Sequence, residues 1–183
     1  MLQLVIPDRP GFEAWDEKNE KFVMVPSVKG AVLQLEHSLI SLSKWESKWH
    51  KSFLTKDEKT FEETIDYIRF MTLTPNVRPE VYENLTEENI KQINDYIGDS
   101  MTATTFREDK TQKPNRERIT SELIYYWMIA LNIPFECQNW HLNRLLTLIR
   151  VCNVKNEPPK KMSQKELYKH HAAVNAARRK KKP

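Results

Sequence analysis

The chain of 183 residues contains only three glycines, Gly11, Gly30 and Gly98. Tight hairpin turns and phosphate-binding loops both depend on glycine, because other residues rarely adopt the backbone angles that they need. The composition therefore argues against a hairpin-rich all-β fold and against glycine-rich nucleotide loops. Hydrophobic residues make up 39% of the chain and charged residues 30%, which is enough for a packed core under a soluble surface.

Residues 1–36 are predicted to form a small β element. Apolar residues alternate with other residues in two segments, the period of a strand with one buried face. They are Leu2, Leu4 and Ile6, and then Ala31, Leu33 and Leu35. A third apolar run, residues 22–25, ends at Pro26. Two or three short strands are therefore expected.

Beyond residue 36, apolar residues recur every three or four positions, the spacing of one helix face. Helices are predicted in five segments, at about 38–53, 57–73, 86–98, 119–131 and 140–153. The predicted fold is mainly α: a bundle of about five helices with a small N-terminal β element and a basic C-terminal tail. Its parts are residues 1–36, the bundle 37–154 with an exposed loop at 99–118, and the partly helical tail 155–183.

Three details of these helices can be predicted. Ser38 is a suitable N-cap, and Gly98 is well placed as a C-cap. Four charged residues of the first helix are assigned to its solvent side, namely Lys44, Glu46, Lys48 and Lys51. Residues 123–131 are apolar on every side, which predicts a helix that is buried all round.

The charge is uneven along the chain. The formal net charge is +4, but residues 155–183 hold ten Lys and Arg against two Glu. The preceding part is therefore slightly acidic, with a net charge of 4 − 8 = −4. No apolar run reaches the roughly 18 residues of a membrane helix, and the first residues lack a basic leader, so we expect neither a membrane span nor a signal peptide.

The two cysteines are expected to be free thiols. Cys137 and Cys152 lie fifteen residues apart, about 22 Å along a helix and too far for a disulfide. Free thiols suit a reducing compartment.

No catalytic or metal centre is predicted. Cys137 and His141 could supply two zinc ligands from one helix face, or a nucleophile and its base, but no third ligand or signature lies nearby in sequence. A core cysteine beside a hydrogen-bonded histidine is the favoured interpretation. Glu62, Glu63 and Asp66 lie near a helix start, where the helix dipole explains acidic residues. We therefore expect a non-enzymatic protein without a cofactor.

Candidate partner-binding residues come from two groups. Tryptophans at helical spacing usually pack in the core, although tryptophan is also enriched at binding hot spots. The candidates are Trp45, Trp49, Trp140 and Arg144, with the tail residues Arg178, Arg179, Lys180, Lys181 and Lys182. The tail could bind phosphates, solubilise the chain or steer an acidic partner. A small nucleic-acid-binding regulator that uses the tail is the alternative function, although the second helix of 119–153 is too apolar to read a DNA groove well.

Several segments resemble small tail assembly chaperones of long-tailed bacteriophages. The strongest are LIYYWMIALNIPFECQ at 123–138 and WHLNRLLTLIRVC at 140–152. Shorter ones are LQLEHSL at 33–39, SKWESKWH at 43–50, MTAT at 101–104, PPKKM at 158–162 and NAARR at 175–179. The resemblance spans most of residues 1–182.

The resemblance implies a role in assembly. Such chaperones are thought to bind the long tape-measure protein, keep it soluble and help tail-tube subunits to assemble around it. They leave before the virion is finished, which implies a location in the host bacterial cytoplasm and absence from the mature virion. The family brings no catalytic or metal-binding residues. A helical protein of this kind is expected to hold a partner helix in an apolar groove, and self-association is left open.

Overall fold

The computed structural model describes residues 1–55, 57–106, 118–156, 168–169 and 171–174. The chain divides into two units, residues 1–152 and 153–183. In the second unit, the last residues of α5 and residues 168–169 and 171–174 are helical. The predicted basic cluster at 178–182 lies outside the described residues.

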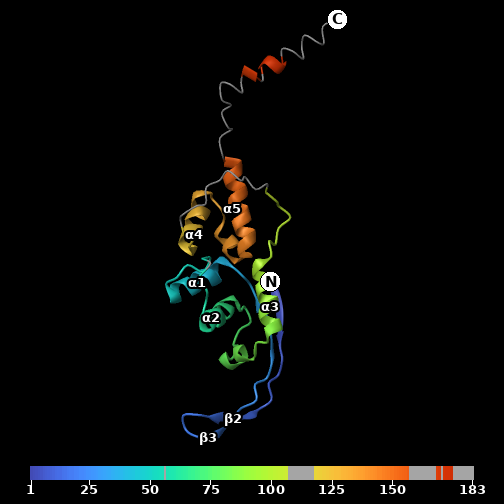
Figure 1. The fold of residues 1–183 in the computed structure, drawn as a ribbon. Helices are drawn as coiled ribbons and strands as arrows, with labels where there is room; N and C mark the ends of the chain where they lie inside the picture. Colours follow the sequence, from blue (N-terminus) through green and yellow to red (C-terminus); the bar gives the residue numbers. More distant parts are fainter. Residues whose placement is uncertain (56, 107–117, 157–167, 170, 175–183) are drawn as a thin grey trace. The chain divides into compact units, whose positions relative to one another are not determined.

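The N-terminal strands form a long antiparallel ribbon (Figure 1). The residue pairing continues from one strand pair to the next without a shift in register. Strand β1 (Leu2–Ile6) pairs with β4 (Ala31–Leu35), and β2 (Phe12–Asp16) pairs with β3 (Lys21–Val25). A single bridge between Arg9 and Val28 lies between the two pairs. Two or three strands were expected, whereas the structure has four, because Pro7, Pro10 and Pro26 interrupt what would otherwise be two long strands.

The β1–β4 half of the ribbon packs on the protein core. Leu4, Ile6, Leu33 and Leu35 are buried and the residues between them are exposed, as the alternation predicts. The backbone N–H of Leu73 donates to the carbonyl of Gln34 over 2.7 Å, which ties β4 to the end of a helix.

Gly30 is required by close backbone packing at the start of β4. A Cβ at this position would lie 2.1 Å from the carbonyl oxygen of Ile6. We expect Gly30→Ala to lower the free energy of unfolding by roughly 1–3 kcal/mol, as overpacking does. The matched control is Gly98→Ala, where nothing lies within 4 Å of the new Cβ and alanine favours the helix by up to about 1 kcal/mol. Urea unfolding of both variants checks this, and a Gly30→Ala protein as stable as the wild type would contradict it.

Within the described part of residues 37–156, five α-helices and two 3₁₀ helices make up most of the structure. They are α1 (Leu39–Trp49), α2 (Phe61–Met71), η1 (Pro79–Asn84), α3 (Glu87–Gly98), α4 (Ser121–Ala130), η2 (Phe135–Asn139) and α5 (Leu142–Asn156). The fold is therefore largely helical with a small β element, as predicted, and mixes α and β structure more than a pure bundle would.

The helix ends follow from local chemistry in most cases. Ser38 caps α1 as predicted, since its hydroxyl accepts a hydrogen bond from the N–H of Ser41. Thr60 and Thr86 cap α2 and α3 in the same way. The prediction for Gly98 is wrong, because it is the last helical residue of α3 and the cap is Asp99 in an extended conformation.

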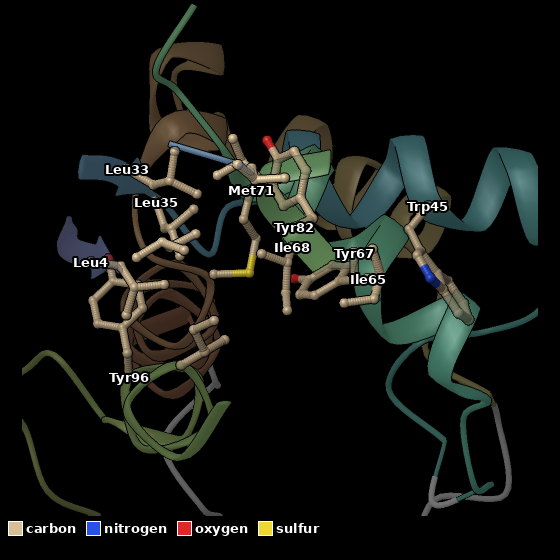
Figure 2. Close-up of a cluster of buried hydrophobic side chains, with 14 residues drawn as sticks. Leu4, Leu33, Leu35, Trp45, Ile65, Tyr67, Ile68, Met71, Tyr82 and Tyr96 are labelled. Atoms are coloured by element: carbon tan, nitrogen blue, oxygen red, sulfur yellow. The ribbon is translucent and has the colours of Figure 1, made fainter. Parts of the chain in front are cut away.

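Two hydrophobic clusters build the core. The first joins the ribbon to α2, η1, α3 and Trp45, and Figure 2 shows its side chains meeting around Ile68 and Met71. The second joins α4, α5 and η2 to Leu39 and Leu42 of α1. Helix α1 therefore contributes to both clusters.

Helix α4 is not buried all round, so that prediction is wrong. Ser121, Ile124 and Met128 are buried, but Tyr126 is 63% exposed and Ile129 is 61% exposed. Among the described residues, other elements cover only one face of α4, although the helix is apolar on both sides. Across the same described ranges, no helix is long and apolar enough to cross a membrane.

Candidate functional site

Trp45 belongs to the core and is unavailable to a partner. Its side chain is 1% exposed, and its indole Nε1 donates a hydrogen bond to the carbonyl of Glu63 over 2.8 Å. Its ring also meets the Phe53 ring edge-on, with ring centroids 5.1 Å apart. The assignment of Trp45 as a partner-binding residue is therefore wrong, and its default interpretation as a core residue is confirmed.

Trp49 and Trp140 are each partly exposed. Trp49 lies one turn beyond Trp45, with ring centroids 6.4 Å apart. Trp140 precedes α5, and the guanidinium carbon of Arg144 lies 4.1 Å from the centroid of its ring. The structure thus brings Trp140 and Arg144 together as a cation–π pair, which packs on the second cluster, while Trp49 packs on the first.

An apolar cleft lies between α2 and α3, and sequence reasoning did not find it. Its volume is about 270 Å³. Its apolar walls are Phe53, Tyr67, Ile68, Ile90, Ile93 and Ile97, and its polar walls are Lys59, Thr64 and Asn94. The isoleucine stripe of α3 was visible in the sequence, but it predicts only burial, and the space left beside it depends on how α2 packs.

The wall of this cleft contains a stacked aromatic pair and a lysine. The rings of Phe53 and Tyr67 are stacked, with centroids 3.8 Å apart. The Lys59 ammonium lies 4.6 Å from the centroid of the Phe53 ring, and among the described residues no carboxylate forms an ion pair with it. A small apolar group carrying a nearby negative charge would match these features.

A second apolar surface is formed by α4 and η2. Tyr126 and Ile129 are three residues apart, which places them on one side of the helix. Phe135 of η2 is 53% exposed and its ring lies 6.5 Å from that of Tyr125. We call Tyr126, Ile129 and Phe135 the α4 surface.

Cys137 and His141 have structural surroundings. Burial, and then the charge of Glu136, raises the pKa of the Cys137 thiol, which disfavours the reactive thiolate. The His141 ring bonds to backbone on both sides, with Nε2 3.0 Å from the carbonyl of Tyr96 and Nδ1 accepting from the N–H of Asn143. Among the described residues, no group of three His, Cys, Asp or Glu side chains is placed to hold a metal ion.

The acidic residues of α2 also act structurally. Glu63 forms a capping box with Thr60, and its carboxylate pairs with the Lys51 ammonium at 2.5 Å. The hydrogen bond from Lys51 holds the pKa of the Glu63 carboxyl below its usual value, the opposite of the raised pKa that a general acid needs. Asp66 is buried and pairs with Lys48 and Arg69.

Comparison of the chain with protein-family models, with curated protein sequences and with solved structures gives no match.

Proposed function

We propose that this chain is a non-enzymatic tail assembly chaperone of a long-tailed bacteriophage, which binds the tape-measure protein, keeps it soluble and promotes assembly of the tail tube. The proposal rests on the resemblance of the segments at 123–152. The structural observation that supports this proposal best is the apolar cleft between α2 and α3. On this proposal the chain acts in the host bacterial cytoplasm and is absent from the mature virion.

The cleft suits apolar side chains of a partner helix. Its volume of about 270 Å³ lies just below the roughly 300–1,000 Å³ of small-molecule sites and is large enough for one or two apolar side chains. On this proposal, an amphipathic helix of the tape-measure protein docks its apolar stripe into the groove. Lys59 would favour segments with an acidic residue beside the stripe.

The α4 surface offers a second contact for the same long partner. Tyr126 is an amphipathic side chain of the type enriched at interfaces. The basic tail, including Arg178, Arg179 and Lys180 to Lys182, would recruit a second, acidic partner, for which tail-tube subunits are the candidates.

The first experiment is co-expression with the tape-measure-like protein of the same genome. With the wild-type chain, we expect the long protein to remain soluble and to co-purify. If the long protein aggregates with and without this chain and nothing co-purifies, the proposed function is wrong, and the nucleic-acid alternative should be tested next.

One substitution tests the cleft itself. We expect Ile97→Gln to reduce the co-purifying long protein by about tenfold, which corresponds to about 1.4 kcal/mol of lost contact energy. The matched control is Lys91→Gln on the exposed side of α3, which should behave like the wild type. Equal yields with Ile97→Gln and the wild type would place the binding site elsewhere.

A further inference from the structure

The distal half of the ribbon exposes apolar side chains. Trp15 of β2 lies directly opposite Phe22 of β3, and their rings meet edge-on with centroids 5.0 Å apart. Met24 lies two residues beyond Phe22 on the same face. The exposed fractions of these three side chains are 52%, 69% and 64%. We call Trp15, Phe22 and Met24 the hairpin face.

The opposite face of this hairpin is not covered by the described residues either. It carries Phe12, which is 48% exposed, and Val23, which is 40% exposed. Every residue of β2 and β3 is exposed or half-buried. An antiparallel sheet normally turns one polar face to water, and an isolated two-stranded hairpin is at best marginally stable there. An apolar hairpin that no described residue covers is therefore typical of a protein–protein interaction site.

The size and charge of this surface fit a second copy of the same chain. Aromatic side chains bury about 150–250 Å² each when covered, so the exposed parts of the hairpin face offer roughly 400 Å² per copy. Two copies would bury roughly 800 Å² from these side chains alone, which lies in the size range of weak or transient interfaces. Residues 8–30 contain five acidic and four basic residues, so two copies can approach without strong repulsion.

We infer that the chain forms a two-fold symmetric dimer in which the hairpin faces of two copies pack against each other. In such a contact the same patch is used by both partners, and Trp15 and Phe22 of each copy become its centre. The inference is independent of the proposed function, because the α2–α3 cleft and the α4 surface take no part in it. The dimer would present two clefts to one long partner.

Sedimentation of the full chain at micromolar concentration tests the dimer. The wild type should sediment as a dimer, and the double variant Phe22→Ser, Met24→Ser should raise the dimer dissociation constant at least about tenfold. Its thermal transition should equal that of the wild type at concentrations low enough for both proteins to be monomeric. A second variant, Trp15→Ser, removes the aromatic ring that lies opposite Phe22 on the other strand and should have the same effect. The matched control is Phe61→Ser, because Phe61 is 77% exposed and lies outside the hairpin.

Three results would overturn the inference. They are a monomeric wild type at all concentrations, hairpin variants that dimerise as tightly as the wild type, and loss of the dimer in Phe61→Ser alone. Tape-measure binding by a monomer would keep the proposed function and reject the dimer. A dimer that binds no tape-measure protein would support the dimer and reject the proposed function.

Discussion

Replacing Glu46 by alanine is expected to lower the free energy of unfolding by about 3 kcal/mol, because one buried and one half-buried backbone amide would lose their acceptor. Glu46 is 7% exposed. One carboxylate oxygen accepts from the N–H of Phe53 over 2.9 Å, and the other accepts from the N–H of Ser121 over 2.7 Å. Glu46 thus holds together α1, the segment after it and the first turn of α4.

The second hydrogen bond replaces a local helix cap. Thr120, the N-cap residue of α4, makes no side-chain capping bond, so Glu46 supplies from α1 the acceptor that the first turn lacks. Its negative charge also lies at the positive end of the helix dipole. Hydrogen exchange of the first α4 amides should therefore accelerate in Glu46→Ala.

Two controls sharpen this prediction. Glu46→Gln keeps one acceptor oxygen and should cost roughly half as much, about 1–2 kcal/mol. Glu58→Ala removes an exposed carboxylate and should change stability by less than about 0.5 kcal/mol. Urea unfolding measures all three, and a Glu46→Ala protein as stable as Glu58→Ala would contradict the bridging role.

The second large effect is a loss of stability in acid that depends on His37. Burial, and then the charge of His141, lowers the pKa of His37 to about 3. Its side chain is 2% exposed, its Nδ1 lies 2.5 Å from the Tyr67 hydroxyl, and its ring lies 5.1 Å from that of His141. A proton on this ring would place a charge in a buried, apolar environment.

The sign of the effect follows from the two pKa values. The unfolded chain takes up the proton near pH 6.5, whereas the folded chain does so only near pH 3. The contribution of His37 is therefore fully present above pH 6.5 and is lost as the pH falls toward 3. The expected loss is about 1.4 kcal/mol per pH unit in that window.

Urea unfolding of the wild type and of His37→Gln at several pH values checks this prediction. The variant lacks the titrating group, so its stability should fall less steeply by about 1.4 kcal/mol per pH unit between pH 6 and 4. The control is His50→Asn, because His50 is exposed at the end of α1 with a φ of 52° and asparagine tolerates that conformation. Parallel curves for the wild type and His37→Gln would contradict it.

Local sequence patterns predicted the elements that depend on local chemistry. The alternation at Leu4, Ile6, Leu33 and Leu35 identified the buried side of β1 and β4, and Ser38 was correctly predicted as an N-cap. The continuous register of the ribbon was not predicted, because its turn contains no glycine. Instead, Glu20 adopts a φ of 48°. This is the left-handed conformation, which a glutamate in a sequence does not predict.

Tertiary packing decided what the patterns could not. Glu46 was assigned to the solvent face of α1, but its partner Ser121 lies 75 residues away. Trp45 and Trp49 share one stripe, yet only Trp45 is enclosed by α2 and the Phe53 ring. Periodicity could not predict how much of α4 its neighbours cover, nor a cleft whose walls come from three separate segments.

The most direct test of the proposed function is hydrogen exchange of the full chain with and without soluble fragments of the tape-measure-like protein. A chaperone that uses the α2–α3 cleft should gain protection in residues 61–71 and 87–98, with weaker protection in 121–130 and none at the exposed turn of residues 17–20. Protection that avoids α2 and α3, or no change with any fragment, would contradict the central claim that this cleft receives a helix of the tape-measure protein.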